Sequence, residues 1–347
     1  TLLLYFLLLY AQRRGAIGMI TMHAWMFLDS YRNLRSWILS SMGIESMAHL
    51  GTRAFDSIGG EVVQTTAFTA TNASSNVDRV GVYLRLVDGR DEGQKSFLLS
   101  ETASNTHHAC RYEVSNAAFS SIQDCVIVYW VDKSILDCYR DSRRIAQIAP
   151  PHKGSDPGDT ERYVRCWMEV PYGRIVHGVG EQEFDNGSTI KWFPFVSGGS
   201  FRRWYGNNRL VINWYPGGKR LKDFEPRSNV RSEKLNFSKT VIWSRISKQV
   251  LAGRYIPHGY VQNDVTPFFE LSDKTESLGL LLAVINSSSL EAIGQAISQS
   301  LHYEVGQVAG LPLPAFSAFS PAGVERLIEI FRADWDARET SWDFARP

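Results

Sequence analysis

A short string near the middle of the chain combines the residue types that contact nucleic acids. Residues 201–209 read Phe-Arg-Arg-Trp-Tyr-Gly-Asn-Asn-Arg. Guanidinium groups neutralise phosphates, planar groups stack on bases or wedge between them, and amides read base edges. We expect the arginine pair to hold phosphates, and the amides with the last arginine to read bases. The predicted DNA contacts in this string are Arg202, Arg203, Trp204, Tyr205, Asn207, Asn208 and Arg209.

The string lies within a strongly basic stretch. Residues 191–260 hold 14 Lys and Arg against 3 Asp and Glu, a charge of +11, together with 13 aromatic residues. The remaining 277 residues hold 23 basic and 33 acidic residues, so the total of 37 against 36 conceals the segregation. Charge concentrated in this way predicts an anionic partner, here double-stranded DNA. Further phosphate contacts are predicted from Lys219, Arg220 and Lys222, whereas each tryptophan taken singly is more typical of a core.

Length and cysteine content restrict the class of protein. With 347 residues and 44% hydrophobic content, the chain can bury one large core or two smaller ones, which excludes disorder. The four cysteines lack the spacing of a disulfide framework or zinc site, so we predict no metal and a cytoplasmic protein. The apolar run 2–11 is too short to span a bilayer and lacks the flanks of a signal peptide, so we predict a buried helix and no membrane partner.

The elements that must position these residues change along the chain. Up to about residue 130, helices and strands alternate, with strands expected over 16–21, 46–50, 62–71 and 80–87 and helices over 2–12 and 29–42. The last two strands are expected to form a hairpin through the polar residues 72–78. Short apolar strands joined by helices favour a mostly parallel sheet covered on both faces.

A Pro- and Gly-rich stretch, 148–159, is expected to be a linker. Beyond it the pattern is typical of short strands, turns and aromatic residues, followed by a helix expected over about 278–300. The predicted domains are therefore 1–147, an α/β domain, and 160–315, a mixed α+β domain, with 316–347 beginning a C-terminal region.

Two longer strings have a specific wording: residues 15–28, which include Gly-Met-Ile-Thr-Met-His-Ala-Trp-Met, and residues 54–68, which include Ala-Phe-Asp-Ser-Ile-Gly-Gly-Glu-Val-Val. They resemble the PglX family, the adenine-specific DNA methyltransferases of BREX phage-defence systems. Later strings similar to the family's target-recognition region are 158–165, 203–208 and 303–308, and the ending 334–344 also matches. The resemblance covers nearly the whole chain.

The family resemblance implies a Rossmann-like domain that binds S-adenosylmethionine and an Asn-Pro-Pro-Tyr loop that holds a flipped adenine. Neither the loop nor a Gly-rich cofactor turn occurs in this sequence, so both are expected upstream of Thr1. The chain would then supply the C-terminal half of the catalytic domain and a target-recognition domain, and would be inactive alone. Other BREX components are implied as partners. Phe55 matches the aromatic residue that stacks on the extruded base, with ordinary core packing as the alternative.

Other candidates are weaker, and rival functions stay open. His23 follows the strand 16–21, where ligands gather in open α/β sheets, and His107-His108 is more typical of a solvated turn than of a metal site. The main rival is a non-catalytic DNA-specificity or interaction subunit. A carbohydrate-binding module would need more acidic residues among the aromatics, and a fused restriction endonuclease would need an acidic and lysine cluster that the sequence lacks.

Overall fold

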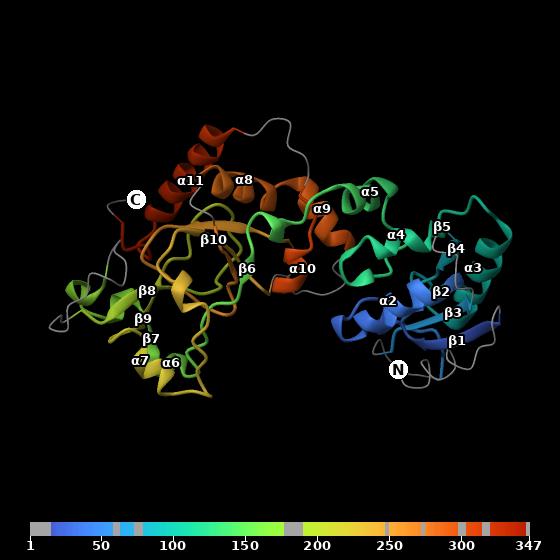
Figure 1. The fold of residues 1–347 in the computed structure, drawn as a ribbon, viewed down its shortest axis with the longest axis horizontal. Helices are drawn as coiled ribbons and strands as arrows, with labels where there is room; N and C mark the ends of the chain where they lie inside the picture. The colour runs from blue at the N-terminus through green and yellow to red at the C-terminus, as the bar shows by residue number, and fades with distance from the viewer. Residues whose placement is uncertain are drawn as a thin grey trace. The chain divides into compact units, whose positions relative to one another are not determined.

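The computed structural model describes residues 15–57, 63–72, 79–176, 190–246, 250–271, 275–297, 303–313 and 320–344. The chain forms two compact units, Thr1–Asp141 (unit 1) and Ser142–Pro347 (unit 2). Each unit has its own sheet structure (Figure 1). The predicted helix 2–12 lies outside the described residues.

Unit 1 is built on a five-stranded sheet in the order β1-β3-β2-β4-β5. Strand β3 is antiparallel to both β1 and β2, β4 is parallel to β2, and β5 is antiparallel to β4. Strands β1, β2 and β4 therefore share one direction, and their carboxyl ends lie at the same edge. The strands are β1 (Ala16–Met22), β2 (Gly43–Gly51), β3 (Thr65–Thr71), β4 (Val80–Arg85) and β5 (Arg111–Ser115).

The expectation of a mostly parallel sheet is wrong, because β3 returns between β1 and β2 and runs against both. The connection from β2 to β3 carries no described helix, and an antiparallel return needs no helical crossover. The expected hairpin between 62–71 and 80–87 is also absent, since β4 pairs with β2 and β5 instead. The strand positions themselves were predicted closely, and the sheet is mixed.

Helices cover the unit 1 sheet and bury its apolar face. The helix expected over 29–42 is a 3₁₀ turn, η2 (Asp29–Tyr31), followed by α2, whose Ile38 and Leu39 are buried. The core includes Met26, Ile44 and Phe68. The helical elements are η1 (His23–Met26), α2 (Arg32–Ser41), α3 (Glu92–Ser104), α4 (Asn116–Ser120), η3 (Gln123–Cys125) and α5 (Lys133–Asp141).

Unit 2 contains two four-stranded sheets, β11-β10-β13-β6 and β12-β8-β9-β7. Trp214 and Trp243 are fully buried and Trp192 nearly so, which confirms that tryptophans of the basic stretch build a core. The strands are β6 (Pro151–His152), β7 (Val164–Cys166), β8 (Trp192–Val196), β9 (Leu210–Asn213), β10 (Thr240–Trp243), β11 (Gly253–Ile256), β12 (Val261–Gln262) and β13 (Phe268–Phe269).

Residues 148–159, expected to be a linker, are folded into unit 2. Strand β6 pairs with β13, and Asp156 forms a bridge with Asn229. A Cβ on Gly154 would lie 2.3 Å from the carbonyl oxygen of Gln262. A Cβ on Gly158, which has φ +68°, would lie equally close to the carbonyl oxygen of Arg227. The glycines of this stretch therefore permit close backbone packing.

The helix expected over 278–300 consists of two helices, α8 and α9. The helical conformation is interrupted at Asn286, whose side chain exchanges hydrogen bonds with the Gly253 backbone (3.0 Å each). No single helix in the described ranges meets the length and hydropathy of a membrane span; only this pair, bent by 56°, does so when its two parts are taken together. The helical elements of unit 2 are η4 (Ile145–Gln147), α6 (Thr160–Tyr163), η5 (Trp167–Glu169), η6 (Tyr172–Arg174), α7 (Lys219–Lys222), η8 (Glu233–Leu235), α8 (Thr275–Ile285), α9 (Ser288–Ile297), α10 (Val305–Ala309) and α11 (Pro321–Asp336).

Candidate nucleic-acid interface

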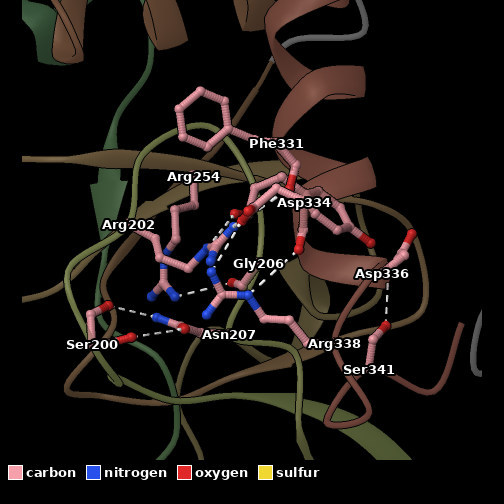
Figure 2. Close-up of polar contacts among 11 residues, drawn as sticks. Ser200, Arg202, Gly206, Asn207, Arg254, Phe331, Asp334, Asp336, Arg338 and Ser341 are labelled. Atoms are coloured by element: carbon pink, nitrogen blue, oxygen red, sulfur yellow. Dashed lines mark hydrogen bonds and ion pairs between the residues drawn. The ribbon is translucent and has the colours of Figure 1, made fainter. Parts of the chain in front are cut away.

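The string 201–209, here called the basic box, is held in place by a buried arginine of β11. Arg254 is 2% exposed and donates a hydrogen bond to the carbonyl oxygen of Gly206 (3.1 Å) (Figure 2). It also donates to the carbonyl oxygen of Gly198 (3.3 Å). Burial lowers the pKa of its guanidinium to about 10, so the group stays charged at neutral pH. One buried cation thus fixes both ends of the loop that carries the box.

The side chain of Arg202 connects the box to helix α11. Its guanidinium donates to the carbonyl oxygen of Tyr205 (3.1 Å) and to Asp334 (2.5 Å), and only 9% of its side chain is exposed (Figure 2). Gly206 has φ +115°, and a Cβ there would lie 2.6 Å from the Arg202 Nε and 3.2 Å from Trp335. The glycine is therefore required for the arginine to reach α11.

The next three positions of the box also face inward. Arg203 donates to Glu291 of α9 (2.8 Å), and Trp204 is half-buried beside β11, to which it is bridged at Arg254. Tyr205 is 4% exposed, and burial raises the pKa of its hydroxyl. It forms a wall of a pocket of about 440 Å³ whose other residues include His258, Tyr260, Arg332, Asp336, Trp342 and Asp343.

The two asparagines were expected to read base edges, and the structure gives them a different position. Asn207 is 9% exposed, and its Nδ2 donates to the carbonyl oxygen of Ser200 (2.7 Å), closing the box loop on itself (Figure 2). Asn208 is 2% exposed. The Asn207 amide is engaged by its own loop and the Asn208 amide is buried, so neither residue presents a free edge to a base.

The remaining predicted cations are on the surface. Arg209, Lys219 and Arg220 are exposed and form no ion pair with any described residue, and Lys222 is exposed but paired with Glu233. Lys219, Arg220 and Lys222 form α7, which is adjacent to α6 (Figure 1), and the Tyr163 hydroxyl donates to the carbonyl oxygen of Arg220 (3.3 Å).

Two further arginines join this surface and were not among the predicted contacts. The guanidinium groups of Arg162 and Arg227 each lie 5.3 Å from the ring centre of Phe224. The α6–α7 face is defined here as Arg162, Lys219, Arg220 and Arg227, all exposed. Asp159 and Glu225, which lie nearby, accept backbone N–H bonds. Glu161, Asp223 and Glu225 are exposed acidic residues beside the face. Arg162 precedes the basic stretch 191–260 and Arg227 lies within it, so the charge count did not bring the two together.

The carboxyl edge of the unit 1 sheet is fixed by two buried cations that sequence reasoning also missed. Arg35 of α2 is fully buried and donates to the carbonyl oxygens of Trp25 (2.8 Å), Leu28 (2.7 Å) and Asp124 (2.8 Å). The Lys95 amine donates to the carbonyl oxygens at the ends of β2 and β4, Leu50 (2.5 Å) and Leu86 (2.9 Å), and burial lowers its pKa. These contacts hold the loops that follow β1, β2 and β4.

Phe55, the predicted base-stacking residue, is 36% exposed in the loop after β2, at this edge. His23 directly follows β1 at the same edge, as expected. His108 accepts from the Cys110 amide (3.1 Å) in a turn, and no three potential metal ligands converge within the described ranges. Gly59, Gly60 and Glu61 lie outside the described residues.

No protein-family model matches the chain. The adenine-specific methyltransferase PglX of Lacticaseibacillus casei (strain Zhang) is 35% identical over 345 residues, covering 96% of this chain and 28% of that protein. The adenine-specific methyltransferase BrxX of Escherichia coli O9:H4 (strain HS) is 31% identical over 338 residues, covering 96% of this chain and 26% of that protein. The chain therefore spans about a quarter of the length of these relatives.

Solved structures align with the chain at low sequence identity. The type IIL restriction-modification enzyme MmeI in complex with DNA covers 98% of this chain and 44% of its own, with 9% identity and a TM-score of 0.48. The type IIG restriction endonuclease BpuSI covers 95% and 43%, with 11% identity and a TM-score of 0.36. Likeness at this level does not extend to function, whereas the curated relatives match over 96% of the chain. Over 96% of its length, the chain is a homologue of one segment of the PglX family of adenine-specific methyltransferases, as its motifs predicted.

Proposed function

We propose that this chain is the DNA-reading part of an adenine-specific DNA methyltransferase that acts in phage defence. The observation that carries the proposal is the similarity, along 96% of the chain, to two proteins named as adenine-specific methyltransferases. The reaction would transfer a methyl group from S-adenosylmethionine to the N6 amino group of adenine in duplex DNA. Other BREX components would be its partners in the cytoplasm.

The two units would divide the work. Unit 1 would complete a Rossmann-like catalytic domain, and the region 160–315 of unit 2 would form the target-recognition domain. The Asn-Pro-Pro-Tyr loop and most of the S-adenosylmethionine site would lie in the part of the protein that these 347 residues do not include. The chain alone would therefore bind DNA without transferring a methyl group.

At the carboxyl edge of unit 1, Phe55 would stack on an extruded adenine. Its ring is 36% exposed, and the loop that bears it begins at the end of β2, which Lys95 holds in place. Stacking on an aromatic ring offsets part of the few kcal/mol that unpairing a base costs. A ring already positioned by the fold loses little side-chain entropy on binding.

In unit 2, phosphate contacts would come from the α6–α7 face and Arg209. These cations are exposed and unpaired among the described residues, so they can neutralise phosphates without first breaking an ion pair. Arg162 and Arg227, both held against Phe224, are pre-ordered for such a contact. The basic box would support this surface from within.

A titration of labelled duplex DNA with the 347-residue chain, followed by fluorescence anisotropy at several salt concentrations, tests the DNA-binding part. The double variant Lys219→Glu/Arg220→Glu should weaken binding and flatten the salt dependence, because each lost phosphate contact removes about 0.9 from the slope. The matched control is Arg90→Glu/Lys133→Glu, which makes the same change in net charge at exposed positions of unit 1. Equal losses in both variants, or none in either, would contradict the assignment.

A non-catalytic DNA-specificity subunit is the second candidate, favoured by the absence of the catalytic tetrapeptide from this sequence. The two differ in the complete gene product that contains this chain. Incubated with tritiated S-adenosylmethionine and duplex DNA, a methyltransferase labels adenine, and Phe55→Ala should reduce the rate while DNA binding persists. A complete product that binds DNA without labelling it would establish the second candidate.

A further inference from the structure

A chain of hydrogen bonds crosses the carboxyl edge of unit 1 and ends at His23. The His49 Nδ1 lies 2.8 Å from the Tyr129 hydroxyl, and the His49 Nε2 lies 2.9 Å from the Nδ1 of His23. His49 and Tyr129 are 3% and 1% exposed, while His23 is half-buried. Three polar side chains far apart in the sequence are thus linked in one line at the edge where β1, β2 and β4 end.

The direction of this line is set at its far end by the Tyr129 hydroxyl. This hydroxyl is buried, and its hydrogen-bond partner among the described residues is the Nδ1 of His49. Because a buried hydroxyl proton needs an acceptor, the proton points to His49. Burial raises the pKa of Tyr129, so its hydroxyl keeps that proton.

The same reasoning carries the direction to His23. Burial, with the charges of Arg85 and Lys95 nearby, lowers the pKa of His49 to about 3, and burial also lowers the pKa of His23, so both rings are neutral at pH 7. A neutral imidazole has one N–H. His49 accepts at Nδ1 and therefore donates from Nε2 to the Nδ1 of His23. The single proton of His23 then sits on its Nε2.

The Nε2 of His23 is the open end of the chain. Among the described residues its side chain bonds only to His49, and the Nε2 is not among the buried polar atoms that lack a partner, so it is accessible to solvent. The neighbouring rings are Phe27, 5.3 Å from His23 and edge-on to it, and Trp130, 5.8 Å from Phe27. Both rings are half-buried, and Arg85 lies over the indole (5.1 Å).

We propose that the line Tyr129, His49, His23 fixes His23 as an Nε2–H donor for a ring nitrogen of a purine bound beside Phe27 and Trp130. Such a ligand needs a donor in its plane and aromatic surface against its face, and this edge supplies both. The choice of a purine rests on the proposed function, whereas the direction of the hydrogen bonds does not. The purine is the adenine of DNA or the adenine of the cofactor.

The tautomer is measured directly on the 347-residue chain labelled with 15N-histidine, with His23→Gln used to assign its signals. At pH 7 both His23 and His49 should carry their proton on Nε2. Tyr129→Phe removes the hydroxyl that sets the direction and should leave His23 in a mixture of both tautomers. The matched control is Tyr83→Phe, which removes the hydroxyl of the ring stacked on Tyr129 (5.0 Å); that hydroxyl has no hydrogen-bond partner, so both tautomers should stay unchanged.

Two probes then distinguish the source of the purine: S-adenosylhomocysteine, and a duplex with one adenine opposite an abasic site. One of them should shift the His23 Nε2 signal, and its affinity should fall roughly fivefold in Tyr129→Phe, the effect of one neutral hydrogen bond. An Nδ1–H tautomer at His23, or a signal unmoved by both probes, overturns the inference. Because DNA binding is read separately by anisotropy, a bound duplex with an unmoved His23 signal would overturn this inference alone.

Discussion

The basic box and, except for Arg162, the α6–α7 face belong to the same basic stretch, yet they present their charge in opposite ways. In the box, Arg202 and Arg203 pair with Asp334 and Glu291. On the α6–α7 face, the cations are exposed and have no ion-pair partner among the described residues. A count of charges along the sequence therefore locates a basic region, but only the fold decides which of its cations are available to a polyanion.

The largest expected effect is on stability, from the buried arginine beneath the box. Arg254→Met should lower the free energy of unfolding by about 3 kcal/mol, because it removes the guanidinium donor from the buried Gly206 carbonyl oxygen and one donor from that of Gly198. Chemical denaturation followed by circular dichroism measures the change. Arg326→Met, at an exposed position of α11, is the control and should change stability by less than about 0.5 kcal/mol. Similar changes in the free energy of unfolding for the two variants would contradict a stabilising role of Arg254 beneath the box.

The second prediction contrasts one arginine from each region. Arg227→Met should reduce the slope of log binding constant against log salt concentration by about 1, with stability unchanged. Arg202→Met should leave the slope unchanged and lower the free energy of unfolding by about 1–2 kcal/mol, since it abandons a bond to the Tyr205 carbonyl. Anisotropy and denaturation on the same preparations give both quantities. A reduced slope for Arg202→Met with an unchanged slope for Arg227→Met would reverse the assignment of the two regions.

A smaller effect depends on pH. The hydrogen bond from Arg202, with the charge of Arg338, lowers the pKa of Asp334 in the folded state. The stabilisation is therefore present above the ordinary aspartate pKa of about 4 and is lost as pH falls through the lower, folded value. Asp334→Asn should melt below the wild type at pH 7, and the difference should narrow as the pH falls below the ordinary aspartate value. Because the carboxylate is 54% exposed, the difference should stay below about 1 kcal/mol. A gap that widens on acidification would contradict the pairing.

The smallest effect is expected at Lys222, which belongs to α7 but is paired with Glu233. Lys222→Ala should change stability by less than about 0.5 kcal/mol, since both partners are well exposed. It should also reduce the salt slope less than Lys219→Ala does, because the ion pair competes with a phosphate. Equal slopes for the two variants would show that the ion pair with Glu233 does not reduce the contact of Lys222 with phosphate.

The sequence predicted strand positions better than strand partners. Alternation and β-branched residues predicted the positions of β1 to β4. Pairing depends on contacts between distant strands, so no local pattern predicted that β3 would lie between β1 and β2. In the site, the type of residue was informative and its exposure was not. Asn207 and Asn208 have the chemistry of base readers, yet the fold buries them; Arg162 and Arg227 are distant in sequence and meet only at Phe224.

Both buried arginines, Arg35 and Arg254, bond to main-chain carbonyl oxygens. A contact with the main chain places little demand on the side chains of the loop that it holds. Loops anchored in this way tolerate sequence exchange as long as their path and the anchoring cation are kept. The segment between Gly198 and Gly206 is accordingly a natural place to graft a different loop sequence, with Arg254 retained as the fixed point of the exchange.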